Sequence, residues 1–130
     1  MSIKSIMIID DSEMDQYLAK YMIKKYDASI ETLQTYDGQE ALEVLQSLEK
    51  QPDLIFLDIN MPRMNGHEFL EKYDNWEGRS EVVIMLTSSD QEQDKEKSMA
   101  FKCVKKYCIK PMELPDLKSL ITDECHWGAR

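Results

Sequence analysis

Short apolar runs alternate along the chain with longer amphipathic stretches. The runs at residues 6–9, 54–57 and 82–86 are continuously apolar, which is typical of strands buried on both faces. A more polar run at 30–36 predicts an edge strand, and residues 107–109 predict a short fifth strand. Because a helical pattern follows each run, the chain predicts five β-α units. This is an α/β fold with a doubly wound parallel sheet and helices on both faces.

Helical periodicity and capping residues mark the helices between these strands. Ser12 precedes a helix that runs to about Tyr26, and Asp37 precedes the next helix. A charged helix is predicted from 90 to 102, and Pro115 fits the first position of a last helix. In the first helix, the apolar residues at helical spacing are Met14, Tyr17, Leu18, Tyr21 and Met22.

The length of the chain fits a single domain. Its 130 residues are enough to bury one core without disulfides or structural metals. Nine residues remain beyond Ile121. We therefore predict one domain over residues 1–130, with a short tail at about 122–130 and no separate output domain.

Charge and cysteine content narrow the partners and the compartment. The 25 acidic residues outnumber the 16 basic ones, and the net charge of −9 argues against binding nucleic-acid backbones or anionic membranes. No apolar run approaches the roughly 18–20 residues that span a bilayer, and the N-terminus lacks a signal peptide. The three cysteines show no Cys-x-x-Cys spacing and are interpreted as reduced thiols, so we expect a cytoplasmic protein.

Polar residues of a particular kind end four of the five predicted strands. They are Asp10 with Asp11, Asp58, Thr87 and Lys110. The carboxyl ends of parallel strands lie along one edge of an open sheet, where ligands bind, so these side chains should converge. Any single one could be an ordinary strand-end or capping residue, but the agreement of four strand ends favours a site.

A cluster of three carboxylates needs positive charge. Two carboxylates about 4 Å apart repel by roughly 4 kcal/mol at an effective dielectric constant of about 20, so the cluster should raise a pKa or recruit a cation. Oxygen ligands favour Mg²⁺, with Mn²⁺ as an alternative, over zinc. A carboxylate beside such an ion can attack phosphorus, while Lys110 neutralises the transferring group and Thr87 donates to one of its oxygens.

The chain resembles the receiver domains of two-component response regulators over essentially its whole length, in a single-domain form like that of chemotaxis regulators. The order and spacing of the motifs carry the resemblance, whereas an isolated Lys-Pro or Asp-Asp pair would carry none. The motifs are Ile9-Asp10-Asp11-Ser12, the segment from Gly38 to Leu42, Leu57-Asp58-Ile59-Asn60-Met61-Pro62 with Asn65-Gly66, Leu86-Thr87-Ser88, and Lys110-Pro111. The resemblance implies a flavodoxin-like sheet with strand order 2-1-3-4-5.

The resemblance also implies roles for the acidic residues. Asp58 would accept a phosphoryl group from a phosphohistidine on a sensor histidine kinase or a phosphotransfer protein. Asp11 would bind Mg²⁺ directly and Asp10 chiefly through water, with further ligands from Asp58 and the backbone carbonyl of Asn60. The chain would catalyse only its own phosphorylation and dephosphorylation.

The remaining motif residues are implied to bind phosphate and to switch the surface. Lys110 would pair with the phosphoacceptor and then with the phosphate, in a geometry set by a cis peptide bond before Pro111. Thr87 and Ser88 would bind the phosphoryl group. Thr87 would shift towards that group, Tyr107 would swing inward behind Thr87, and the altered surface would bind a downstream protein.

Some residues depart from the family pattern or have a simpler interpretation. No glycine is available near Cys103, where the family usually closes its fourth helix. Ser89 lies at a position that tunes phosphate lifetime in relatives. His67 is interpreted as a solvated side chain on a short third helix, predicted after the turn-rich residues 60–66, and the terminal Cys125-His126-Trp127 has no assigned role.

Two other function classes use similar aspartates or a similar fold. In haloacid-dehalogenase-like phosphatases and phosphotransferases the nucleophile lies in Asp-x-Asp after the first strand, whereas this chain has Asp10-Asp11-Ser12 there and no cap domain. A flavin-binding flavodoxin-like domain needs a phosphate loop rich in Ser, Thr and Gly. The acidic residues after the first strand would repel a phosphate. A receiver would gain a labile phosphate from acetyl phosphate, and a flavodoxin would copurify yellow.

Overall fold

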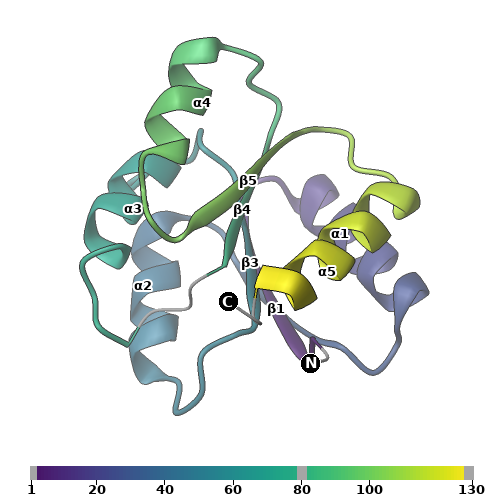
Figure 1. Ribbon diagram of the computed structural model, residues 1–130. Coiled ribbons are helices and arrows are strands. Elements are labelled where there is room, and N and C mark those ends of the chain that lie inside the picture. The colour runs from purple at the N-terminus through teal and green to yellow at the C-terminus, as the bar shows by residue number, and fades with distance from the viewer. Residues whose placement is uncertain (1–2, 79–81, 128–130) are drawn as a thin grey trace.

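The computed structural model describes residues 3–78 and 82–127, the last five of them by their backbone alone. Within these residues strands and helices alternate through five β-α units (Figure 1). The strands are β1 (Ser5–Ile9), β2 (Glu31–Thr35), β3 (Leu54–Leu57), β4 (Val83–Thr87) and β5 (Val104–Ile109). The helices are α1 (Glu13–Tyr26), α2 (Gly38–Ser47), α3 (Gly66–Tyr73), α4 (Glu92–Met99) and α5 (Leu114–Trp127).

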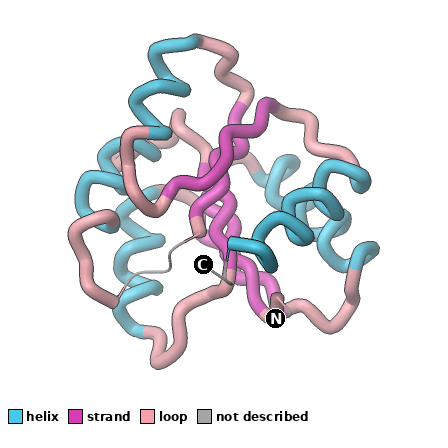
Figure 2. The backbone as a smooth tube through the Cα atoms, viewed as in Figure 1, coloured by secondary structure: helices cyan, strands magenta, loops and turns pink. Residues whose placement is uncertain are grey.

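The five strands are parallel and lie in the order β2-β1-β3-β4-β5, which confirms the predicted order. Figure 2 shows this sheet between two layers of helices. In Figure 1, α1 and α5 cover one face and α2 and α3 the other, while α4 packs beside α3 and β5. The fold is therefore the expected doubly wound α/β sandwich.

Side chains of the central strands alternate between two apolar cores. Met7 and Ile9 of β1 pack with α2 and α3, whereas Ile6 and Ile8 pack with α1 and α5. Every residue of β3 and β4 is buried. This explains the continuous apolar runs in the sequence, because both faces of the sheet are covered. The packing of helices on both faces of the sheet also fixes the positions of the residues that follow each strand.

Capping hydrogen bonds confirm the predicted starts of α1 and α2, and a further one begins α3. Ser12 Oγ accepts from the backbone N–H of Asp15 at 3.2 Å, at the start of α1. Asp37 Oδ1 accepts from the backbone N–H of Glu40 at 2.8 Å, at the start of α2. Asn65 begins α3 with a reciprocal capping box. These helices therefore begin in the loops beyond the carboxyl ends of β1, β2 and β3, which places their first turns near the predicted site.

The face of α1 that packs on the sheet is not the apolar stripe that the sequence suggests. Four large apolar residues of this helix are between 49% and 66% exposed: Met14, Tyr17, Leu18 and Tyr21. Gln16, Ala19 and Ile23, which share a helix face at spacings of three and four, are buried instead. The Gln16 amide donates to backbone carbonyls at the ends of β1 and β2. A polar side chain thus makes a contact with the sheet that a hydrophobic pattern cannot detect.

The helix α4 is shorter than the predicted helix at 90–102. It closes at Ala100 without a glycine, because the backbone N–H of Ala100 bonds to the carbonyl of Glu96 and Phe101 continues the turn through Ser98. β5 begins at Val104, earlier than predicted, because it pairs with β4 from Val83 onward.

The C-terminal helix is longer than predicted. The segment from residue 122, expected as a tail, continues α5 to Trp127, because no Gly or Pro lies between Pro115 in its first turn and Gly128. The side chains of Cys125, His126 and Trp127 lie outside the part of the chain that the structure describes. Across the described residues, no helix combines the length and hydrophobicity that crossing a bilayer requires.

Candidate functional site

The residues that end the strands converge at one edge of the sheet, as the parallel topology predicts. Asp10 directly follows β1, Asp58 follows β3, Thr87 ends β4 and Lys110 follows β5. Carboxylate oxygens of Asp10, Asp11 and Asp58 all lie within 4.8 Å of one another. Three acids, one hydroxyl and one ammonium group are therefore gathered at the carboxyl ends of the strands, where open α/β sheets bind ligands.

The acids of this cluster differ in their exposure. Asp10 and Asp58 are only 4% and 7% exposed, whereas Asp11 faces solvent. Burial raises the pKa of Asp10, and repulsion from Asp58 adds to that effect. Hydrogen bonds from Lys110 and from the backbone N–H of Ser12 oppose it. The net rise shows that burying the Asp10 carboxylate outweighs these contacts, so the site favours additional positive charge.

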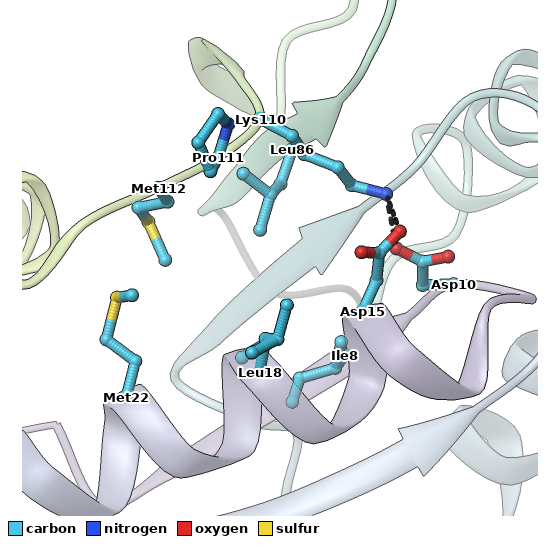
Figure 3. A pocket seen from close by; sticks show the side chains of 10 residues that line it. Ile8, Asp10, Asp15, Leu18, Met22, Leu86, Lys110, Pro111 and Met112 are labelled. Atoms are coloured by element: carbon cyan, nitrogen blue, oxygen red, sulfur yellow. Dashed lines mark hydrogen bonds and ion pairs between the residues drawn. The ribbon is translucent and has the colours of Figure 1, made fainter.

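Lys110 lies between three carboxylates, two of which, those of Asp10 and Asp15, are seen in Figure 3. Its Nζ is 2.7 Å from Asp10 Oδ2, 2.8 Å from Asp15 Oδ2 and 3.4 Å from Asp58 Oδ2. Burial disfavours the charged ammonium, but hydrogen bonds to Asp10 and Asp15 and attraction to Asp58 outweigh it and raise the pKa of Lys110. Lys110 therefore stays charged at neutral pH. The peptide bond between Lys110 and Pro111 is cis, as the resemblance implied.

The three carboxylates fit a hard divalent cation. As ligands they offer oxygen atoms alone, and the exposed Asp11 keeps the cluster open to solvent. Asn60, whose backbone carbonyl is a predicted further ligand, lies two residues beyond Asp58 in the exposed loop after β3. Its role stays a prediction. The donor set suits Mg²⁺ or Mn²⁺ better than zinc, which prefers nitrogen and sulfur.

The predicted phosphate-binding hydroxyls lie at the end of β4. Thr87 is fully buried, and its Oγ1 accepts a hydrogen bond from the backbone N–H of Ser89 at 3.3 Å. Its carbonyl accepts from the backbone N–H of Lys110, which ties the ends of β4 and β5 together. Ser88 is exposed in the bend after β4, and its contact with phosphate stays a prediction.

Ser89 connects the site to α4 and to β5. Its Oγ donates to Asp94 Oδ2 in α4 at 2.5 Å, and its carbonyl accepts from the hydroxyl of Tyr107 at 2.9 Å. Tyr107, the predicted switch residue, is half-buried, and its ring packs against the core on the α2 and α3 side. Thr87, Tyr107 and α4 therefore all meet at Ser89.

The glycine of the Asn65-Gly66 motif has a steric role. A Cβ at Gly66 would lie 2.4 Å from the backbone carbonyl oxygen of Asp58, far inside van der Waals contact. The backbone N–H of Gly66 donates to the carbonyl of Ile59. Glycine thus allows α3 to begin directly against the loop that carries Asp58.

His67 is buried, so the interpretation of a solvated side chain is wrong. It is 6% exposed, its Nε2 lies 2.9 Å from Ser98 Oγ, and its ring also hydrogen-bonds to the backbone of Asp94. Burial lowers the pKa of His67, and the positive charge of Lys97 lowers it further. Of the residues of α4, all of which the structure describes, only Ser98 is buried. The contact between His67 and Ser98 therefore helps to hold α4 against α3.

Sequence reasoning missed three contributors to the site: Asp15, Gln16 and Ser89 as a link between elements. Asp15 lies in the first turn of α1 and follows no strand directly, yet it forms an ion pair with Lys110, 95 residues away in sequence. Gln16 donates to the carbonyl of Asp10 at 3.0 Å and so supports the acidic loop. For Asp15 and Gln16, the available signal was their position in the first turn of a helix that starts at the acidic loop.

Comparisons with known proteins agree with this geometry. Residues 6–122 match the family described as the response regulator receiver domain. The polar-differentiation response regulator DivK of Brucella anthropi is 34% identical over 113 residues, which cover 86% of this chain and 88% of DivK.

Two solved structures are similar over most of their length. The phosphorylated cyanobacterial phytochrome response regulator RcpA is 26% identical with a TM-score of 0.79, covering 94% of this chain and 91% of that one. The Mn²⁺-bound form of the response regulator Rcp1 is 28% identical with a TM-score of 0.76, covering 92% and 90%. The chain belongs to the response regulator receiver domain family of two-component phosphorelay signalling.

Proposed function

We propose that Asp58 is the phosphoacceptor of this receiver domain, and that its donor is a phosphohistidine on a sensor histidine kinase or phosphotransfer protein. The observation that supports this most is the position of the Asp58 carboxylate. It lies at the end of the central strand β3, grouped with two further acids and 3.4 Å from Lys110 Nζ. The similarity to the phosphorylated RcpA is in agreement.

The residues around Asp58 suit an in-line phosphoryl transfer. A carboxylate oxygen of Asp58 attacks phosphorus, and the bond from phosphorus to the donor imidazole nitrogen breaks. The imidazole, protonated at its other nitrogen, leaves as a neutral group. Lys110 is a permanent positive charge beside the transferring oxygens. Among the described residues, the Thr87 hydroxyl accepts a hydrogen bond and donates none, so its proton is available for a phosphoryl oxygen.

The acidic cluster would hold Mg²⁺, or Mn²⁺, through Asp10, Asp11, Asp58 and the carbonyl of Asn60. A divalent ion bound there would neutralise charge on the acids and on the incoming phosphoryl group. The raised pKa of Asp10 and the similarity to the Mn²⁺-bound Rcp1 support this assignment. Since the protein fills only part of such a coordination sphere, binding should be weak and completed by water and phosphate.

We further propose that the output surface is formed by α4, β5 and α5. A shift of the Thr87 hydroxyl towards phosphate would break its contact with Ser89 N–H and loosen a residue that also holds Tyr107 and Asp94. The docking of α4, which buries only Ser98, is weak enough to respond to such a local change. The partner would be a downstream protein that recognises this altered surface.

The net charge and the cysteines of the chain support the expected classes of partner and the expected compartment. The net charge of −9 disfavours nucleic acid and anionic membranes as partners. Cys103 and Cys108 are both thiols in the structure, in line with the reducing cytoplasm. We also propose that the chain catalyses only its own phosphorylation and dephosphorylation, at Asp58.

The test is intact mass spectrometry after incubation with acetyl phosphate and Mg²⁺. Wild type should gain one labile phosphate, with transfer to Asp58 and release of acetate, and chelation of the metal should suppress the gain. Asp58→Asn should gain none. Asp90→Asn, which changes an exposed aspartate outside the cluster, should be labelled as wild type is. Normal labelling of Asp58→Asn would refute the assignment.

A further inference from the structure

Lys110 is closer to two other carboxylates than to the phosphoacceptor. Its Nζ lies 2.7 Å from Asp10 and 2.8 Å from Asp15, but 3.4 Å from Asp58. Figure 3 shows Asp15 reaching from α1 to the same ammonium group that Asp10 contacts. Asp15 belongs to a helix instead of a strand end, and it is outside the group of carboxylates that could share a metal ion.

We propose that Asp15 is a positioning residue that restrains Lys110 away from Asp58 in the unphosphorylated protein and thereby slows phosphoryl uptake. The proposal rests on phosphoryl acceptance at Asp58. It assigns Asp15 a part in setting the rate of that reaction through Lys110, without contact between Asp15 and the phosphoryl group.

The hydrogen-bonding capacity of the ammonium group explains the restraint. A lysine ammonium has three N–H donors, and here they face three carboxylates. To bind a phosphoryl oxygen, Lys110 must give up one of these contacts. Asp10 and Asp58, together with Asp11, form the group of carboxylates that could share a cation. Asp15 is outside that group, so Lys110 is the only charged group of the site that Asp15 would hold.

The restraint should be modest. The side chain of Asp15 is 35% exposed and that of Lys110 is 16% exposed, so water partly screens the pair. A partly exposed ion pair changes an equilibrium by roughly two- to fivefold, and the uptake rate should change by a similar factor.

Asp15 has a second role that the experiment must separate. It is an acid in the first turn of α1, where negative charge stabilises a helix N-terminus. Glu13 is the other acid of that turn and is exposed. Glu13→Gln therefore removes the same charge from the same turn and serves as the matched control.

The experiment measures the initial rate of labelling by acetyl phosphate with Mg²⁺, by intact mass, for proteins whose thermal unfolding has been checked. Asp15→Asn should be labelled roughly two- to fivefold faster than wild type. Asp15→Ser should behave like Asp15→Asn. Asp15→Glu, which restores a carboxylate, and Glu13→Gln should both be labelled at the wild-type rate.

Three results would overturn the proposal. These are labelling of Asp15→Asn at or below the wild-type rate, an equal acceleration by Glu13→Gln, and no return to the wild-type rate in Asp15→Glu. The second would show that net charge near the site is the cause and not Lys110. Failure of wild type to be labelled at all would instead refute phosphoryl acceptance itself, and would be seen separately.

Discussion

At the residue scale, the site is an arrangement of negative charge around one ammonium group. Lys110 is contacted by Asp10, Asp15 and Asp58, and its pKa is raised despite its burial. The pKa of Asp10 is also raised, chiefly by burial, which favours the neutral carboxyl, whereas the raised pKa of Lys110 favours the charged ammonium. One lysine therefore does not fully compensate the acids, which is the condition that a divalent cation and a phosphoryl group can use.

His67 should make the stability of the protein depend on pH. Its pKa in the folded state lies below the usual 6.5, chiefly because it is buried, so the unfolded state binds the proton more readily. The stabilising contribution is complete above pH 6.5 and is lost as the pH falls from there through the folded-state pKa. Denaturant unfolding between pH 7.5 and 5 should therefore show a larger loss of unfolding free energy for wild type than for His67→Gln.

Comparing wild type with His67→Gln separates the pH dependence due to His67 from that due to the carboxylates, which both proteins contain. The groups whose charge acts on His67 are Lys97, Asp94 and Glu71, and all three are retained in the variant. Parallel pH profiles for wild type and His67→Gln would show that the ring is not buried against α4 in solution.

The residues that sequence reasoning identifies and those that it misses differ in a physical way. Asp10, Asp58 and Lys110 follow buried strands, and the parallel order of the strands alone brings such positions together. The contact of Asp15 with Lys110 depends on the rotation of α1 about its axis, and the burial of His67 depends on where α4 packs. These are tertiary facts, which local patterns do not contain.

At the scale of elements, the exposed stripe of α1 is a candidate surface for the phosphodonor. Tyr17 and Tyr21 stack on each other in solvent, and Leu18 lines a hollow shared with Asp15 and Lys110. The proposed phosphohistidine donor would approach Asp58 from this edge of the sheet. Leu18→Ser with Tyr17→Ser should slow phosphotransfer from such a protein by about tenfold, which corresponds to about 1.4 kcal/mol of lost interface contact.

Acetyl phosphate is the control for this prediction, because it needs no protein contact. The double variant should be labelled by acetyl phosphate at the wild-type rate. An equal loss with both donors would mean that the substitutions damage the site itself, and an unchanged rate with the protein donor would place its docking elsewhere.

Hydrogen exchange should reveal the response of α4. With beryllofluoride as a phosphate mimic, we expect altered amide protection across residues 88–110 in wild type, because Ser89 links Thr87 to Asp94 and Tyr107. Thr87→Ala should show much smaller changes in that segment while still binding the mimic. Changes centred instead on residues 14–26 would show that the switching surface is α1.

At the scale of the whole molecule, function and stability conflict at the acidic cluster. Two of its three acids are buried in a protein with a net charge of −9. Asp58→Asn removes one charge while Lys110 keeps Asp10 and Asp15. Without divalent metal, the free energy of unfolding of the variant, measured in urea, should be equal to that of wild type or higher, by up to about 2 kcal/mol.

Adding Mg²⁺ should reverse the trend, because an ion that binds only the folded state stabilises it. Wild type should gain more unfolding free energy than Asp58→Asn. A variant that is clearly less stable than wild type without metal would show that Asp58 is stabilised by its contacts, contrary to this account.

Chemical trapping can show whether the phosphoryl group resides on Asp58. Borohydride reduces an aspartyl phosphate to homoserine, so wild type treated with acetyl phosphate and Mg²⁺ and then reduced can be mapped by tandem mass spectrometry. We predict homoserine at position 58 and at no other aspartate, and none when acetyl phosphate is omitted. Homoserine at Asp10 or Asp11, or no conversion at position 58 in protein that has gained phosphate, would contradict the assignment.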